Sequence, residues 1–162
     1  MRLSGKVSWI AAGLVLGLVP LLVAAQSASP HAQPAKISGK RLIAASEMKW
    51  APMPGLEGAQ QVALFGDPTK EAHRILYKWA PGTKAPLHTH THGDRAVVLS
   101  GTLSLAVEGA APKLLPPGSF FEMAGGTPHI TAVEGEAPCV FYLEREGPFD
   151  ANMVEAAPKT AK

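Results

Sequence analysis

GTKAPLHTHTHGDRAVVLSG, residues 82–101, is the stretch of sequence that decides what this chain can be. His88 and His90 lie two positions apart, and in a β-strand such side chains point to the same side. Asp94 follows a short turn and begins the next strand, from which it can approach the same point. Imidazoles and a carboxylate in this spacing predict a site for a divalent transition metal.

A further histidine, His129, follows a glycine- and proline-containing turn and is a candidate third imidazole. Neutral imidazole suits iron, nickel, copper and zinc, whereas magnesium or calcium would require more oxygen ligands than this stretch offers. We expect iron, with manganese, nickel, copper and zinc as alternatives. A non-haem iron site binds its metal through histidine and carboxylate and keeps coordination positions open.

Short apolar runs separated by glycine and proline predict an all-β domain over residues 37–150. The run from residue 73 to 80 is the clearest strand, because Ile75, Tyr77 and Trp79 alternate with mostly polar residues. Many short strands of this kind form a sandwich or a closed barrel. The expected strands are residues 61–65, 73–80, 95–99, 103–107, 119–123, 130–133 and 139–144.

The opening stretch resembles the first sequence motif of the cupin superfamily, which is a glycine, His-x-His, a glutamate and a closing glycine. Gly82, His88, His90 and Gly101 match that motif, and Asp94 stands in the glutamate position at the same spacing. The resemblance extends over roughly residues 46–148 and is closest to small exported bacterial single-domain cupins.

The second cupin motif is also recognisable, in GSFFEMAGGTPHITAV, residues 118–133. Gly118, Gly126 and His129 are in place, while Ala124 and Val133 replace the proline and the asparagine of the motif. The resemblance implies a cupin double-stranded β-helix, a jelly-roll barrel that holds a metal, and it implies that His129 is a ligand. It also implies a homodimer.

The fold hosts many activities, so the reaction is a separate question. We expect a metal-dependent dioxygenase-type oxidoreductase that acts on a small organic substrate, with His88, His90, Asp94 and His129 as ligands. One alternative is a metal- or ligand-binding module without turnover, similar to the cupin domains of zinc-sensing anti-sigma factors. Another is an isomerase or lyase in which the metal acts as a Lewis acid.

Two positions of the predicted site have competing interpretations. Asp94 is one methylene shorter than glutamate, so it either ligates the metal or accepts the free N–H of a ligating histidine. His92 shares the parity of His88 and His90 but lies in the turn, where it faces solvent, replaces Asp94 as a ligand or shuttles protons. Glu122 and His92 are the candidates for a catalytic acid or base, although Glu122 is a surface charge if Phe121 and Met123 face the barrel.

The pocket wall can also be nominated from the sequence, because aromatic residues and a methionine fall at inward positions of the expected strands. Such a wall around a metal suits a small organic ligand. The residues nominated are Tyr77, Trp79, Phe121, Met123 and Phe141.

The first 25 residues read as a secretory signal peptide, since Arg2 and Lys6 precede an apolar run that ends in small residues before Gln26. An uncleaved membrane anchor is the alternative, because the run approaches the ~20 residues that span a bilayer. Residues 26–36 are rich in alanine, proline, serine and glutamine and predict a flexible linker, and residues 151–162 predict a weakly ordered tail. We therefore expect a periplasmic or secreted protein with no stable membrane association after cleavage.

Charge and cysteine content exclude some classes of protein. Without residues 1–25 the count of lysine and arginine falls from 15 to 13, against 13 acidic residues, so the remainder is formally neutral. Such a chain has no basic surface for nucleic acid, and we expect a small-molecule ligand as its partner. Cys139 is the single cysteine, so no intrachain disulfide can form, and its apolar neighbours predict a buried thiol.

Overall fold

The computed structural model describes residues 39–155. The predicted signal peptide, residues 1–25, and the predicted linker, residues 26–36, lie outside the described residues, as does the end of the chain from residue 156. Within the described part, no helix has the length and apolarity needed to cross a membrane. The helical content of that part is a single turn of 3-10 helix, η1 (Ala45–Glu47).

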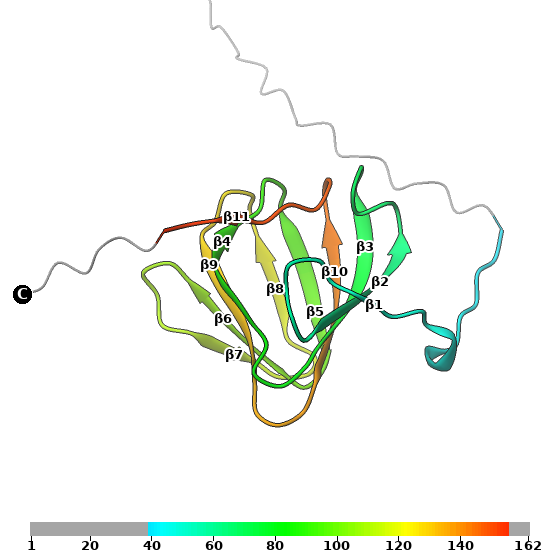
Figure 1. The fold of residues 1–162 in the computed structure, drawn as a ribbon, viewed down its shortest axis with the longest axis horizontal. Helices are drawn as coiled ribbons and strands as arrows, with labels where there is room; N and C mark the ends of the chain where they lie inside the picture. Colours follow the sequence, from blue (N-terminus) through cyan, green and yellow to red (C-terminus); the bar gives the residue numbers. More distant parts are fainter. Residues whose placement is uncertain (1–38, 156–162) are drawn as a thin grey trace, which may run out of the picture. The chain divides into compact units, whose positions relative to one another are not determined.

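Two antiparallel sheets make up the domain (Figure 1). The six-stranded sheet has the order β1 (Ala51–Pro52), β2 (Ala59–Phe65), β3 (His73–Trp79), β10 (Cys139–Arg145), β5 (Asp94–Ser100) and β8 (Phe120–Met123). The five-stranded sheet has the order β11 (Asn152–Met153), β4 (Lys84–Thr89), β9 (His129–Glu134), β6 (Thr102–Val107) and β7 (Lys113–Leu115).

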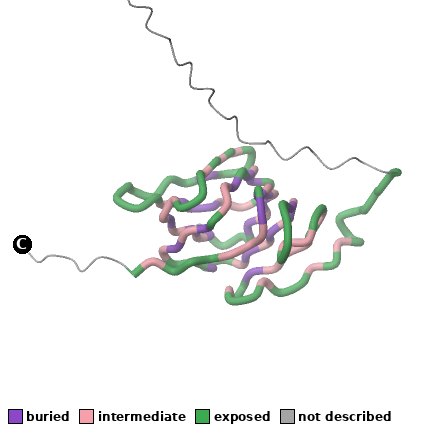
Figure 2. The backbone as a smooth tube through the Cα atoms, turned by 90° about the horizontal axis from the view of Figure 1, so that it is seen from above, coloured by how far each residue is buried: buried purple, intermediate pink, exposed green. Residues whose placement is uncertain are grey.

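The strand order confirms the predicted jelly-roll barrel. Strands that are distant in sequence pair side by side, because β10 lies between β3 and β5, and β9 lies between β4 and β6. Each pairing that the sheets contain is antiparallel. Buried residues lie in the strands in the middle of the domain, and the loops are mostly exposed (Figure 2). The core therefore lies between the sheets.

Alternation of buried and half-buried residues explains why these segments form strands. In β3 and β10 every second residue is buried, starting from the first residue of each strand. Ile75, Val98 and Leu103 are the largest apolar side chains that are fully enclosed, and they come from both sheets. The expected burial of Cys139 is confirmed, and burial raises the pKa of its thiol to about 11.

Most of the expected strands are present, and the differences are at their ends and in short segments. The sheets also contain β1, β4, β7 and β11, beyond the expected strand ranges. Residues 151–162 were expected to be a weakly ordered tail, but Asn152 and Met153 pair with Thr89 and His88. Two residues give no periodicity that a sequence pattern could reveal. The residue Asp150, which precedes this strand closely, makes contacts that are described below.

The glycine at the β5–β6 turn has a specific steric role. Gly101 has a φ of 70°, and a Cβ placed there would lie 2.5 Å from the carbonyl oxygen of Pro138. Gly82 has a similar φ of 76°, but a Cβ placed there would have no heavy atom within 4 Å. Both glycines belong to the cupin motif. Because both have a positive φ but only Gly101 is crowded, alanine substitutions at the two positions distinguish the cost of backbone strain from the cost of crowding.

We expect Gly101→Ala to lower the free energy of unfolding more than Gly82→Ala does. A left-handed φ costs alanine about 1–2 kcal/mol at either site, and the contact with Pro138 should add a further 1–3 kcal/mol, roughly, at Gly101 alone. Urea denaturation of the two variants measures the difference. Equal losses of unfolding free energy in the two variants would show that the backbone around Pro138 can move away from the added methyl group without cost.

Candidate metal centre

Three histidines, from two neighbouring strands and the end of one of them, come together inside the barrel. His88 lies near the end of β4, His90 follows that strand directly, and His129 opens β9. His88 and His129 are direct cross-strand partners, which brings their rings to a centroid separation of 4.3 Å. One ligand atom from each of the three residues lies within 4.8 Å of the others, and all three side chains are buried.

Backbone carbonyls fix the orientation of all three rings. In His88 and His129, Nδ1 donates to the carbonyl two residues earlier in the chain, at 2.7 Å and 2.9 Å. In His90, Nδ1 donates to the carbonyl of Asp150. A carbonyl oxygen only accepts hydrogen bonds, so Nδ1 carries the proton in each neutral ring and Nε2 keeps its lone pair.

The free Nε2 atoms fit a cation. The Nε2 atoms of His88 and His90 lie 3.2 Å apart, and in the neutral rings neither atom has a proton to donate to the other. Burial, followed by the charge of Arg145, lowers the pKa of His90 to about 4, and burial also lowers the pKa of His129. These two imidazoles therefore stay neutral near pH 7, the form that binds a metal, and the donor set suits iron, nickel, copper or zinc.

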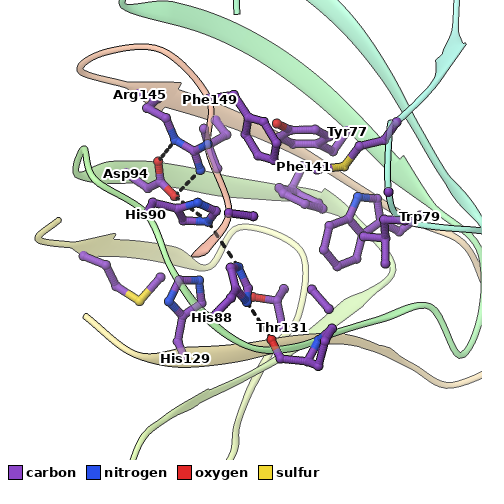
Figure 3. Close-up of a pocket in the computed structure, with 18 of the residues that line it drawn as sticks. Tyr77, Trp79, His88, His90, Asp94, His129, Thr131, Phe141, Arg145 and Phe149 are labelled. Carbon is purple, nitrogen blue, oxygen red and sulfur yellow. Dashed lines mark hydrogen bonds and ion pairs between the residues drawn. The ribbon is translucent and has the colours of Figure 1, made fainter. Parts of the chain in front are cut away.

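A pocket of about 330 Å³ lies beside the three imidazoles (Figure 3). All five apolar residues nominated from the sequence line it, and the Tyr77 and Phe141 rings pack with centroids 5.2 Å apart. Burial raises the pKa of Tyr77 to about 12, so its hydroxyl remains a hydrogen-bond donor at neutral pH. The pocket therefore combines a largely apolar wall with a few polar groups, as binding sites for small organic molecules do.

Asp94 is buried in this pocket but is held by Arg145. The arginine donates from Nε and Nη2 to the two carboxylate oxygens at 2.6 Å and 2.7 Å. The nearer Asp94 oxygen is 3.8 Å from Nε2 of His90, and Asp94 is not in the group of converging ligand atoms. Asp94 in β5 lies directly opposite Arg145 in β10. The short aspartate side chain therefore pairs with the guanidinium across the strands and does not extend to the histidines.

The structure places the two candidates for a catalytic acid or base outside the pocket. Glu122 is exposed on β8 and pairs with Arg95 at 3.1 Å. The ring of His92 packs closely against the backbone of Gly147, and His92 does not line the pocket. Glu122 faces outward because Phe121 and Met123 take the inward positions of β8, while His92 lies in the turn that separates β4 from β5.

The segment after β10 closes over the histidines and was not anticipated from the sequence. Its Asp150 carbonyl accepts from His90, while the Asp150 carboxylate accepts from the backbone N–H of Thr91 at 2.9 Å and from the Thr91 hydroxyl. Phe149 adds a ring that lies 5.8 Å from His90 and 4.9 Å from the Arg145 guanidinium carbon. This segment thus orients one ligand and contributes an aromatic wall.

Comparison with known protein families agrees with this architecture. The family model described as the cupin domain matches residues 75–143, which run from within β3 to within β10 and include the three histidines. This chain is a member of the cupin superfamily. A search of curated proteins found no match to the sequence.

Solved structures with the same fold include a cyclase and a lyase. The polyketide cyclase RemF of Streptomyces resistomycificus is 17% identical, with a TM-score of 0.60, over 74% of this chain and 89% of that one. KdgF of a Halomonas species is 20% identical, with a TM-score of 0.55, over 65% of this chain and 94% of that one. The DMSP lyase DddQ of Ruegeria pomeroyi is 18% identical, with a TM-score of 0.55, over 67% and 61%. At these identities the likeness establishes the fold alone, and the reaction has to be inferred from the residues of the site.

Proposed function

We propose that this cupin is a metal-dependent dioxygenase-type oxidoreductase that acts on a small organic substrate. The convergence of three Nε2 lone pairs inside a mostly apolar pocket carries this proposal. When bound to these three imidazoles, an iron ion would supply open coordination positions for a substrate and for O₂. The backbone carbonyls hold the imidazoles in the tautomer that binds metal, and the aromatic side chains make most of the pocket wall apolar.

The ionisable groups of the pocket favour oxygenation over isomerase or lyase chemistry. Proton abstraction from carbon needs a basic group within reach of the substrate. Among the described residues that line the pocket, Asp94 is occupied by Arg145, and the pKa of Tyr77 is raised to about 12 by burial. Arg145 engages both oxygens of the Asp94 carboxylate, and the Tyr77 hydroxyl keeps its proton at neutral pH, so neither group is arranged to abstract a proton from carbon. The cyclase and lyase among the structural neighbours have only the fold in common with this chain on present identities.

Oxygen consumption tests the proposed reaction. We expect full chain loaded anaerobically with Fe(II) to consume O₂ when a substrate from a panel of catechols, diketones and flavonols is added. The His129→Ala variant should lose this consumption, because it lacks one of three ligands, while the His92→Ala variant should retain it, because His92 lies outside the pocket.

Two other outcomes would point to different functions. Stoichiometric iron without O₂ uptake on any member of the panel would contradict the dioxygenase. Zinc held tightly with no exchangeable water would favour the alternative, a binding or sensing module without turnover, because a structural zinc site has its coordination filled by protein.

The cellular setting remains part of the proposal. The positive residues and apolar run within residues 1–25 support export to the periplasm or beyond, and an N-terminus of the mature chain near Gln26 would be the expected product. Such a compartment supplies O₂ but no soluble reduced nicotinamide, which suits a reaction without a reducing cosubstrate. The homodimer implied by the family also stays a proposal, which sedimentation of the purified chain can test.

A further inference from the structure

Arg145 is a charged residue at an inward position of an apolar strand. Cys139, Phe141 and Leu143 are the preceding inward residues of β10, and all three are buried. Arg145 continues this series with only 3% of its surface exposed, and it lines the same pocket as the histidines. Burying a guanidinium costs several kcal/mol, roughly, unless its charge and its donors are satisfied, so this position requires an explanation.

Asp94 accepts hydrogen bonds from only some of the N–H donors of the Arg145 guanidinium. Arginine has five N–H donors, two of them on Nη1. The bidentate contact with Asp94 uses Nε and Nη2, while Nη1 is buried and has no hydrogen-bond partner among the described residues. Buried donors are almost always paired in folded proteins. The unpaired donor belongs to a side chain that lines the pocket of the three histidines, so a molecule bound in that pocket is a candidate acceptor.

The charge balance of the pocket points to an anion. The contact between Arg145 and Asp94 pairs one positive with one negative charge, so Asp94 does not offset the charge of a bound metal. Three neutral imidazoles do not offset it either. A divalent ion in this buried site would keep two positive charges, and an anionic ligand would be the group that lowers this cost.

The surroundings of Arg145 indicate the shape of that anion. Figure 3 shows the Tyr77 hydroxyl pointing toward Phe149 and Arg145, so a second donor faces the same side of the pocket. The rings of Phe149 and Phe141 provide flat apolar surfaces next to these donors. The volume of about 330 Å³ is at the small end of ligand pockets, which span roughly 300–1,000 Å³.

We propose that Arg145 and Tyr77 form a carboxylate-binding subsite, so that the substrate of this cupin is a small organic acid with a planar apolar body. Calling this acid the substrate rests on the proposed function, because it is then the molecule that the oxygenation site would take. The subsite itself is a binding property, which exists whether or not turnover occurs.

Binding of a matched pair of ligands tests the subsite. Benzoate and benzamide have nearly the same shape, but only benzoate is an anion at pH 7. We expect the zinc-loaded full chain to bind benzoate at least about tenfold more tightly than benzamide in calorimetric titrations, because hydrogen bonds to charged groups contribute about 1.5–3 kcal/mol. Equal affinities would overturn the proposal.

The double variant D94N/R145Q assigns the preference to the arginine. It removes one charge of each sign, so the net charge of the chain is unchanged, and amide side chains can still pair across β5 and β10. We expect a fall of at least about tenfold in the benzoate-to-benzamide preference. Unchanged preference in this variant would show that the metal alone selects the anion and would overturn the role of Arg145.

A control and a second variant complete the test. The R74Q/E144Q variant removes the neighbouring pair between β3 and β10, whose side chains are 39% exposed and face away from the pocket, and it should keep the full preference. If D94N/R145Q does not fold, Tyr77→Phe takes its place. We expect a loss of about fivefold in the preference, because a hydroxyl binds a carboxylate about 1 kcal/mol more strongly than it binds a neutral amide oxygen.

The outcomes separate this inference from the proposed reaction. A preference for benzoate that depends on Arg145, in a chain that consumes no O₂, would retain the subsite and reject the dioxygenase. Oxygen consumption on neutral substrates with no preference for benzoate would do the reverse.

Discussion

Changing His129 to alanine is expected to abolish stoichiometric metal binding. His129 supplies one of the three ligand atoms that converge in the described part of the chain, and its ring is held by the Thr127 carbonyl at 2.9 Å. Loss of a group that merely orients a ligand costs about 10- to 100-fold in affinity, so loss of a ligand itself should cost more than about 100-fold. Metal content after dialysis, with competition against a chelator, measures the effect.

His92→Ala is the matched control for this prediction. His92 belongs to the same HTHTHGD run, but its ring packs against Gly147 and lies outside the group of converging ligand atoms. Its removal should leave metal affinity within about twofold of the wild type, an effect below the ~10-fold expected even for groups that orient ligands. Metal loss in His92→Ala that equals the loss in His129→Ala would show that the three-histidine set is misassigned.

Changing Arg145 to methionine is expected to cost about 3–5 kcal/mol in the free energy of unfolding. The side chains of Arg145 and Asp94 are 2% and 4% exposed, and removal of the arginine leaves a buried carboxylate without its partner. The double variant D94N/R145Q should recover most of this loss, because it removes both buried charges together. Urea denaturation of the metal-free proteins at pH 7 gives the values for a double-mutant cycle.

The pair between Arg74 and Glu144 is the internal comparison. Their contact distance is 2.9 Å, but both side chains are 39% exposed, so solvent screens the attraction. Arg74→Met should therefore cost no more than about 1 kcal/mol. If Arg145→Met also cost no more than about 1 kcal/mol, the unpaired Asp94 carboxylate would have been protonated or hydrated without cost. The buried pair would then not stabilise the barrel.

The three histidines could be predicted because their positions follow from local rules. Parity places His88 and His90 on one side of a strand, and the glycine before His129 matches a motif that the same fold uses. The pocket wall was predictable for the same reason, since alternation alone turns Tyr77 and Trp79 inward. Local periodicity, in short, predicts which face a side chain takes.

The role of Asp94 could not be predicted, because it depends on a pairing between residues 51 positions apart. The register that sets Asp94 opposite Arg145 is a property of β5 and β10 in the folded sheet. One signal was available: Arg145 has the parity of Cys139, Phe141 and Leu143, and a charge at the end of such an inward series indicates a buried ion pair or a ligand contact.

The role of the segment that follows β10 could not be predicted from the sequence for a different reason. Its strand β11 has two residues, too few for a periodic pattern. Its position is set by the contacts of Asp150 with Thr91 and His90, which are side-chain and carbonyl interactions across 59 and 60 residues. Sequence patterns describe neighbours along the chain, whereas such contacts are visible only after the barrel has formed.

X-ray absorption spectroscopy of the cobalt-loaded chain tests the central claim most directly, because it counts and identifies the ligands of the metal. The structure predicts one ion per chain, with the scattering of three imidazoles and the remaining positions filled by exchangeable oxygen ligands. The spectrum of the D94N/R145Q variant should retain the three imidazoles. A carboxylate ligand that disappears with Asp94, or fewer than three imidazoles in the wild type, would contradict the three-histidine site.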